Sequence, residues 1–340
     1  MILVLNCGSQ SIKWKVFDDK LKVVQEGRRE ILNPPLFKRI LIEELEKLKN
    51  KNLKISKIGH RVVHGKDIFV KPTPITPESL QKIESLSYLA PLHNPFNILG
   101  IKACHNVFGG VPQIAVFDTE FFKDLPEVAF IYPLPEEIRK EFGFRKYGFH
   151  GISHEYVAKK AANILKRPFE KLKIITCHLG GGASITAIKG GRAVDTSMGF
   201  TPMQGLVMMT RAGDLDSGIV LELVRRFGPD KTENILNKES GVKGICNEKE
   251  MLKILSKLNT GREKNKYRLA LDVFIYSVKK YIGAYYAILG GCNALVFTGA
   301  IGAGDPRTRE MICGGLNILK KTKIMAIETD EELAIAQKIL

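Results

Sequence analysis

Two arginines in this sequence lie beside small residues at the ends of apolar runs, where a side chain can bind an anion. Arg61 lies in the run GHRVVHG, and Arg211 lies in MMTRAGD. A guanidinium binds carboxylate or phosphate oxygens through two parallel hydrogen bonds, although a surface ion pair is the usual role of a lone arginine. Fixed positive charge of this kind favours chemistry in which two anions approach one another, such as phosphoryl transfer.

Three histidines are further candidates. His150 lies among glycines in YGFHG, which leave room for a ligand, and its ring could donate to a phosphoryl oxygen. Burial for packing alone is the alternative for this residue. His178 begins the run HLGGG and is a candidate for a phosphate contact, whereas His93, in PLHNP, is expected to have a structural role near a substrate pocket.

Two acids are candidates for a magnesium site. Mg²⁺ prefers hard oxygen ligands and keeps several waters, so one or two carboxylates suffice. Asp118 follows an apolar run in AVFDT, and Glu331 begins the final helical pattern in TDEEL. For Glu331 a simpler explanation stands beside this one, because the helix dipole by itself favours an acid in the first turn.

Three glycine-rich turns follow apolar strands. They are NCGSQS from Asn6 to Ser11, HLGGGAS from His178 to Ser184, and TGAIGAG from Thr298 to Gly304. Backbone N–H groups in such turns can form a nest for an anion, and the third turn also precedes a helix whose N-terminus favours negative charge. Each turn alone is explained by chain reversal. Together the three turns predict a cleft between two similar lobes that holds a polyphosphate.

Hydrophobic periodicity places these residues on alternating strands and helices. In the first half we expect a helix at 36–48, a helix-rich stretch at 77–107, and strands at 2–6, 11–18, 23–31, 57–63 and 113–118. In the second half we expect helices from 217 onward and at the C-terminus, with strands at 174–178, 184–189, 192–195, 294–298 and 323–327. This alternation predicts an α/β fold.

Length and composition narrow the class of protein. A chain of 340 residues with 44% hydrophobic content is expected to form two domains. No basic leader precedes the first apolar run and no apolar stretch reaches about 18 residues, so we expect neither secretion nor a membrane span.

Six cysteines without a C-x-x-C pair argue against a disulfide framework or zinc site and favour the cytoplasm. The net charge of +16 is mixed with acids, which favours a solvated surface that attracts anionic substrates over a nucleic-acid site.

The chain resembles the acetate kinase family across nearly its whole length. The resemblance is carried, in order, by LNCGSQSIKWKVFD, GHRVVHG, APLHNPFN, AVFDTEFF, KYGFHGISHEYV, HLGGGASITAIKGGRAVDTSMGFTPMQGLVMMTRAGDLDSGIV, LALDVFIYSVKKYIGAYY, LVFTGAIG and TDEELAIA. It implies the fold of sugar kinases, actin and the Hsp70 ATPase, in which two ribonuclease-H-like α/β lobes have a nucleotide cleft between them. We expect the N-terminal lobe at 1–120, joined by the C-terminal helix 331–340, and the nucleotide-binding lobe at 121–330.

The resemblance also implies an activity: reversible, Mg²⁺-dependent phosphoryl transfer between ATP and acetate, giving acetyl phosphate and ADP, with Mn²⁺ as an alternative metal. It implies a homodimer, whose interface we expect at 269–289. Transfer is expected to be direct and in line, because a carboxylate is already an anion and needs no general base. Arg61 would orient the carboxylate, Arg211 would stabilise the transferring group, and Asp118 would orient Arg211 or the waters on the metal.

The other site residues follow from the same resemblance. His150 is implied as a catalytic residue, and Asn6 and Glu331 are implied at the metal. The acyl pocket would be lined by Arg61, Val63, Leu92, Phe149 and Pro202. The nucleotide would be bound by Asn6, Ser9, Ser11, Lys13, His178, Gly180, Gly181, Gly182, Gly299, Ala300, Ile301 and Gly302.

Several positions depart from the family pattern. Gly181 replaces an asparagine, Ala303-Gly304 replaces Glu-Asn, and the segment Cys246 to Glu250 replaces an Asp-x-Arg that contacts adenosine. Between Gly315 and Lys323 the chain lacks a β-rich insertion. These departures lead us to expect that the nucleotide is bound mainly through its phosphates, with loose selection of the base.

Four alternatives remain open at this point. A propionate or butyrate kinase would share the chemistry, and propionate ranks above butyrate because butyrate kinases lack the runs TSMGFTP and TRAGD found here. Overlapping activity stays open, because one methylene contributes only about 1–3 kcal/mol to discrimination. A pyrophosphate-dependent acetate kinase would explain the altered adenosine segment. An Hsp70-like or actin-like ATPase would share the fold but leave Arg61 and its apolar neighbours without a purpose. Nucleic-acid binding by the basic surface ranks last.

Overall fold

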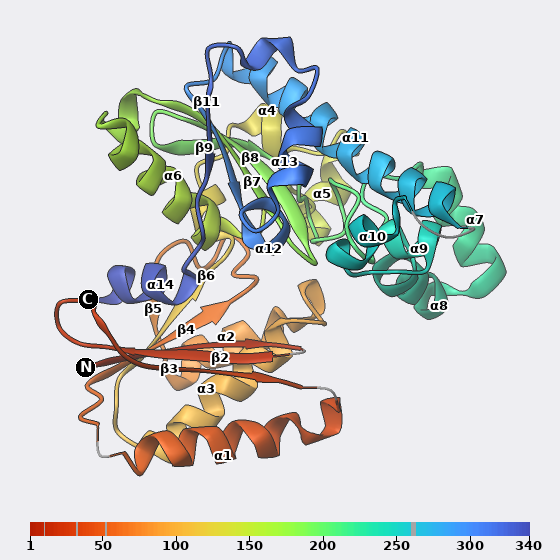
Figure 1. Ribbon diagram of the computed structural model, residues 1–340. Helices are drawn as coiled ribbons and strands as arrows, with labels where there is room; N and C mark the ends of the chain where they lie inside the picture. The colour runs from red at the N-terminus through yellow and green to blue at the C-terminus, as the bar shows by residue number, and fades with distance from the viewer. Residues whose placement is uncertain (10, 32, 52, 260–262) are drawn as a thin grey trace. The chain divides into compact units, whose positions relative to one another are not determined.

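The computed structural model describes residues 1–9, 11–31, 33–51, 53–259 and 263–340, so Gln10 of the first glycine-rich turn lies outside the described residues. The chain divides into two compact units (Figure 1). Unit 1 comprises Met1–Lys123, Phe149–Tyr156 and Asp330–Leu340, and unit 2 comprises Asp124–Gly148 and Val157–Thr329. Both ends of the chain therefore belong to unit 1.

Unit 1 is built on a six-stranded sheet with the strand order β3-β2-β1-β4-β6-β5. The first three strands along the chain form an antiparallel meander, and β1, β4 and β6 run parallel. The elements are β1 Ile2–Gly8, β2 Ser11–Phe17, β3 Val23–Glu30, α1 Phe37–Lys49, β4 Lys57–Val62, β5 Thr73–Pro74, α2 Pro77–Ser85, α3 Asn94–Phe108, β6 Gln113–Phe117 and α14 Glu331–Ile339.

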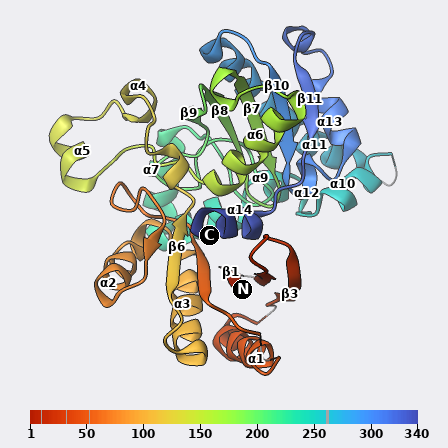
Figure 2. The ribbon, with the colours of Figure 1, turned by 90° about the vertical axis from the view of Figure 1, so that its left-hand side faces the viewer.

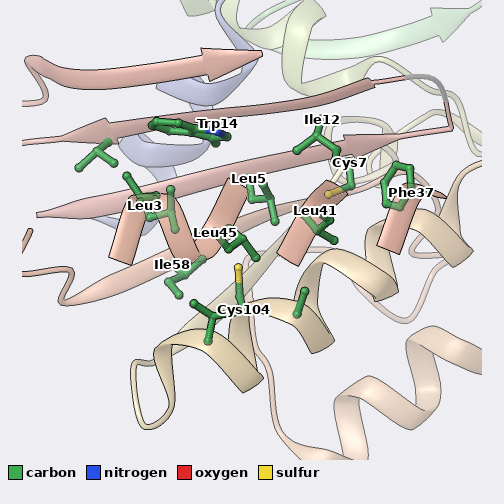
Figure 3. Packing of buried hydrophobic residues seen from close by; sticks show 14 of the residues in the cluster. Leu3, Leu5, Cys7, Ile12, Trp14, Phe37, Leu41, Leu45, Ile58 and Cys104 are labelled. Carbon is green, nitrogen blue, oxygen red and sulfur yellow. The ribbon is translucent and has the colours of Figure 1, made fainter. Parts of the chain in front are cut away.

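The two faces of this sheet pack against different helices. Leu3, Leu5 and Cys7 alternate along β1 and pack with Leu41 and Leu45 of α1 in the core of unit 1 (Figure 3). Figure 1 and Figure 2 show α1 and α3 on this face and α14 on the opposite face. Residues between the core positions of β1 therefore face α14, and a polar side chain at such a position lies beside that helix.

Unit 2 contains a five-stranded sheet with the order β11-β10-β7-β8-β9. Here too an antiparallel meander, β7-β8-β9, is followed by two parallel strands, β10 and β11, so the topology of unit 1 is repeated. This confirms the predicted α/β class. The strands are β7 Lys173–Leu179, β8 Ala183–Lys189, β9 Arg192–Thr196, β10 Ala294–Thr298 and β11 Lys323–Ala326.

The helices of unit 2 include several that the sequence patterns did not predict. Among these, α4 and α5 are short and have no buried residue, so they carry no hydrophobic period. No helix within the described ranges is both long and apolar enough to cross a membrane. The helices are α4 Glu127–Phe130, α5 Glu136–Phe142, α6 Gly151–Leu165, which begins in unit 1, α7 Ser217–Phe227, α8 Pro229–Asn234, α9 Gly241–Cys246, α10 Met251–Lys257, α11 Lys264–Leu289, α12 Gly299–Gly302 and α13 Pro306–Cys313.

One histidine of the unit 1 sheet is held neutral by its surroundings. His60 of β4 is 1% exposed. In the amide orientation that gives both side-chain atoms of Gln113 a hydrogen-bond partner, the amide nitrogen donates to His60 Nε2 at 2.6 Å. Burial lowers the pKa of His60 from 6.5 to about 4, because the charged ring would lose its water.

We expect unit 1 to lose stability as the pH falls from 6.5 to about 4, because the unfolded chain then binds a proton that the folded chain excludes. This contribution, about 3 kcal/mol, is fully present above the unfolded pKa and is lost as the pH falls through the folded pKa. The variant His60→Gln keeps a polar contact but does not titrate. Its free energy of unfolding in urea should depend less on pH across this window than that of the unsubstituted chain, and parallel pH curves would contradict the prediction.

Candidate functional site

The carboxyl ends of two parallel strands bring Arg61 and Asp118 together. Val62 of β4 lies opposite Phe117 of β6, so the residues beside them reach the same edge of the sheet. Arg61 Nη2 lies 2.6 Å from Asp118 Oδ2, and Arg61 Nε lies 3.2 Å from each carboxylate oxygen. The side chains are 16% and 1% exposed, so this is a largely buried ion pair.

Glu331, the first residue of α14, is the second carboxylate on Arg61. Its Oε2 lies 2.9 Å from Arg61 Nη1 and accepts a hydrogen bond from Asn6 Nδ2 at 3.1 Å. The same amide donates to Glu332 Oε1 at 3.0 Å. Asn6 lies between core positions of β1 and so faces α14, which explains how residues 325 positions apart in the chain come into contact.

The start of α14 is fixed by a cap and an ion pair. Asp330 Oδ1 accepts from the Leu333 N–H at 2.9 Å, and Asp330 Oδ2 lies 2.8 Å from Lys15 Nζ. Burial disfavours the charged Lys15, but the contact with Asp330 outweighs it and raises the pKa of this lysine. Sequence reasoning missed Lys15, Asp330 and Glu332. The run TDEEL carries a helix-start signal that could have identified the last two.

The electrostatics of the cluster are dominated by burial and pairing. Burial disfavours the charge of Arg61, but Asp118 and Glu331 outweigh it and raise the pKa of the guanidinium further. Burial raises the pKa of Asp118 above its usual value, and Arg61 opposes that rise. Asp118 and Glu331 pair with Arg61, Asp330 pairs with Lys15, and Glu332 accepts from the uncharged Asn6 amide, so several carboxyl groups gather around these two cations.

His150 is tied to Asp118 through the backbone. Its N–H donates to the Asp118 carboxylate, and the next N–H, from Gly151, donates to the Asp118 carbonyl oxygen at 3.1 Å. A Cβ at Gly151 would lie 2.1 Å from that oxygen, so only glycine fits. His150 itself has a φ of +58°, a left-handed conformation that is costly for a residue with a Cβ. The predicted catalytic histidine therefore carries backbone strain.

The residues predicted for an acyl pocket are only partly brought together. Val63 is 6% exposed, and its N–H donates to Asn97 Oδ1 at 3.1 Å. Phe149 is 1% exposed and packs edge-on against His64, with 5.3 Å between ring centroids. Both lie in unit 1 beside the Arg61 strand. The half-buried Leu92 also belongs to unit 1, Pro202 belongs to unit 2, and His93 lies at the N-cap of α3.

The first hairpin places three predicted nucleotide contacts near Asn6. β1 pairs with β2 so that Gly8 lies opposite Ser11, and Ser9 is in the turn. Lys13 lies opposite Asn6 in the same register, and side chains of opposite residues share a face. Lys13 also lines a surface groove together with Lys15, Arg28 and Glu332.

In unit 2, the second glycine-rich hairpin joins β7 to β8. His178 is the penultimate residue of β7, and the N–H of Gly180 donates to the Gly182 carbonyl oxygen at 3.0 Å, closing the turn. That N–H is therefore committed to the chain itself. A Cβ at Gly181 would meet no heavy atom within 4 Å, so packing does not require the glycine found there.

The third glycine-rich segment differs from the expectation of an open turn. Gly299–Gly302, which includes Ala300 and Ile301, forms the single helical turn α12 directly after β10. Gly299 has a φ of +78°, and a Cβ there would lie 2.6 Å from the Leu179 carbonyl oxygen. The absence of a side chain at Gly299 therefore permits close packing against the end of β7. This packing explains the glycine without a ligand, and the phosphate contact stays a prediction.

Arg211 is a partly buried cation of unit 2. Its Nη1 donates to the Pro202 carbonyl oxygen at 3.3 Å and lies 3.9 Å from Met208 Sδ. Within the described part of unit 2 no carboxylate forms an ion pair with it, and burial lowers the pKa of its guanidinium. A desolvated guanidinium without a carboxylate is prepared to bind an anion.

A magnesium ion fits the donor chemistry of the unit 1 cluster. Among the described residues there is no preformed group of three or more His, Cys, Asp or Glu side chains with metal-site geometry. Mg²⁺ nevertheless needs only one or two protein oxygens and keeps its waters. The carboxylates of Glu331 and Glu332, which share the Asn6 amide as a donor, would supply such oxygens.

Comparisons with known proteins identify the family of the chain. The profile of the Acetokinase family matches residues 36–338. An acetate kinase of Dictyoglomus turgidum is 43% identical over 392 aligned positions, which cover 99% of this chain and 96% of that protein. The crystal structure of Porphyromonas gingivalis acetate kinase has a TM-score of 0.87 at 34% identity, with 99% of this chain and 98% of that chain covered. The crystal structure of a propionate kinase from Francisella tularensis has a TM-score of 0.90 at 37% identity, with 99% and 98% covered.

Proposed function

The chain belongs to the acetokinase family, and we propose that it transfers a phosphoryl group reversibly between ATP and acetate, giving acetyl phosphate and ADP. Membership makes it a phosphotransferase with a carboxyl group as acceptor. The observation that carries the choice of substrate is Arg61, a largely buried guanidinium on the strand that leads to the buried apolar Val63, with the buried Phe149 packed on the next residue, His64. A short carboxylate has the charge and the apolar tail to suit both features.

Arg61 retains the donors that this role needs. A guanidinium has five N–H groups, and the ion pairs to Asp118 and Glu331 use Nε and one hydrogen on each terminal nitrogen. Within the described residues, one N–H on each terminal nitrogen is left for a substrate carboxylate. Because Asp118 and Glu331 fix the guanidinium plane in advance, little reorganisation is needed when the substrate binds.

The reaction requires no proton transfer. A carboxylate oxygen attacks the γ-phosphorus, the new O–P bond forms as the bond to the β-phosphate oxygen breaks, and ADP leaves with its electron pair. Arg61 orients the carboxylate, and Arg211 offsets the charge that spreads over the transferring group. His150, held against Asp118, is the candidate donor to an equatorial oxygen.

We assign magnesium to Asn6 and Glu331, with Glu332 as a neighbouring carboxylate. These residues would hold the metal, which would supply positive charge to offset the charge of the phosphates, and Mn²⁺ would serve the same purpose. The two units serve as the two lobes of the family fold. Ser9, Ser11, Lys13, His178 and the glycines 180–182 and 299–302 are the proposed nucleotide contacts.

A hydroxamate assay tests the function directly. The chain is incubated with acetate, propionate or butyrate and with ATP, GTP or pyrophosphate, and acyl phosphate is trapped as the hydroxamate. We expect acetate with ATP to give the highest kcat/KM, and GTP to lie within about tenfold of ATP, a gap of roughly 1.4 kcal/mol. Higher kcat/KM with propionate would support the propionate kinase alternative. Nucleotide hydrolysis without any acyl product would contradict the proposal and favour an ATPase.

We expect Arg61→Ala and Arg211→Ala each to lower turnover at least about 100-fold, because each removes a fixed donor to the transition state. Circular dichroism checks that both variants fold. Arg39→Ala and Arg226→Ala are matched controls, since these arginines are 78% and 69% exposed and pair only with a neighbouring helical glutamate. Near-normal turnover in both test variants would remove these arginines from the site.

Glu331→Gln should raise the concentration of Mg²⁺ needed for half-maximal rate, because it removes a charged oxygen from the metal site while keeping the side-chain shape. Glu222→Gln, at an exposed helical ion pair, is the control. The measurement is a magnesium titration at saturating ATP and acetate. An unchanged midpoint in Glu331→Gln would exclude this residue from the metal site.

We also propose a homodimer. The expected interface helix, α11, buries Phe274, Val278 and Ile282 within unit 2, but Leu269 and Tyr276 remain 56% and 73% exposed and lie two helical turns apart on one face. Light scattering at micromolar concentration should give twice the chain mass of 37.9 kDa, and Leu269→Glu/Tyr276→Glu should reduce it. A monomeric unsubstituted chain would refute the dimer.

We place the protein in the cytoplasm, since all six of its cysteines are free thiols and four of them are buried. Cysteines that form no disulfide are typical of proteins in a reducing compartment. Fractionation of cells that express the chain tests this location, and recovery in a secreted fraction would overturn it.

A further inference from the structure

A second buried ion cluster lies in unit 1, outside the site described above. Lys338 Nζ is 2.8 Å from Glu120 Oε1 and 2.7 Å from Glu155 Oε2. The three side chains are 21%, 11% and 16% exposed. Burial disfavours the charged lysine, but the two carboxylates outweigh it and raise the pKa of Lys338. We refer to Lys338, Glu120 and Glu155 as the Lys338 cluster.

Each member of the cluster belongs to a segment that carries a site residue. Glu120 follows Asp118 by two residues, at the start of the 3₁₀ turn Glu120–Phe122. Glu155 lies one helical turn after Gly151, whose N–H binds the Asp118 carbonyl oxygen. Lys338 lies two helical turns after Glu331, on the same side of α14. The cluster therefore joins the three segments that meet around Asp118.

Helix α14 is docked along that same side by close packing. Ile335 and Ile339 lie against Gly59 of β4, where an added Cβ would come within 2.7 Å of both side chains. Gly59 is two residues before Arg61, so the helix rests on the strand that carries the guanidinium. This apolar packing sets the distance between α14 and the sheet. The rotation of α14 about its own axis is set by ion pairs at its two ends, Glu331 with Arg61 and Lys338 with its two carboxylates.

We propose that Lys338 is a positioning residue for the reaction. By holding Glu120 and Glu155 at once, it keeps Glu331 and the His150–Gly151 backbone in register with Asp118 and hence with Arg61. Only the kinetic part of this inference rests on the proposed function.

A purely stabilising role explains the cluster less well. Buried ion pairs are weak contributors to stability, because desolvation offsets much of their attraction. In addition, Glu120 Oε2 is buried and has no hydrogen-bond partner among the described residues, which costs free energy. What the cluster supplies is a fixed geometry between three segments, and a site that depends on fixed geometry gains from it.

The test uses Lys338→Met, which keeps the length of the side chain but removes the charge, and Lys338→Arg, which keeps the charge. Lys82→Met is the matched control, because Lys82 pairs with Glu78 at 2.7 Å on the surface of unit 1, with the two side chains 55% and 76% exposed. The triple variant Lys338→Met/Glu120→Gln/Glu155→Gln removes the cluster without leaving a buried unpaired carboxylate, in case Lys338→Met does not fold.

Hydrogen–deuterium exchange and steady-state kinetics are the two readouts. In Lys338→Met and in the triple variant we expect residues 116–123, 147–156 and 328–340 to exchange at least about fivefold faster, with 270–289 unchanged. We expect kcat to fall at least about tenfold, with KM for ATP within about twofold, because misplacement affects the transition state more than nucleotide binding. Lys338→Arg and Lys82→Met should keep both properties.

Two results would overturn the inference. One is exchange that is unchanged or accelerated uniformly across the chain. The other is a normal kcat in a folded Lys338→Met or triple variant, which would show that the cluster does not position the site. If the unsubstituted chain forms no acyl hydroxamate, the proposed function fails, and the exchange experiment alone then decides whether the cluster holds these segments.

Discussion

The guanidinium of Arg61, buried between the carboxylates of Asp118 and Glu331, is the interaction on which the site of unit 1 depends. Each partner comes from a different part of the chain: a central strand, the end of its parallel neighbour, and the C-terminal helix. Removing any one of the three would leave charge buried without a partner, which typically costs about 3–5 kcal/mol. This explains why the chain returns at its C-terminus to the unit in which it began.

Simple backbone rules make this convergence possible. Alternation along β1 turns Leu5 and Cys7 to the core and Asn6 to α14, so one strand serves both faces of the sheet. Glycine is required where two segments must approach more closely than a Cβ allows. Gly59 admits α14 to the sheet, and Gly151 admits the start of α6 to the Asp118 carbonyl. The positions of Glu331 and His150 both follow from these contacts.

The sequence predicted most of the strands and the α/β class well, because strands that are buried on both faces appear as short, nearly continuous apolar runs, as in β1 and β10. It could not predict which charges pair, since pairing depends on contacts between distant segments. The ion pairs of Lys15 with Asp330 and of Lys338 with Glu120 were missed for this reason. Glycine-rich runs were also ambiguous, because glycine occurs both in the hairpin turn at 180–182 and in the packed helical turn at 299–302.

The two arginines that the sequence singled out differ in electrostatic state, and the difference supports the different roles proposed for them. Arg61 already has two carboxylates beside it, so its charge is compensated before any ligand binds. Its proposed contribution is therefore mainly to orient the ligand. Arg211 has only a carbonyl oxygen and a sulfur among its described polar contacts, and burial lowers its pKa. Its charge is therefore costly until an anion arrives, and binding an anion relieves that cost. A carboxylate, which needs orientation, suits the first arginine. A phosphoryl group, whose oxygens gain charge during transfer, suits the second.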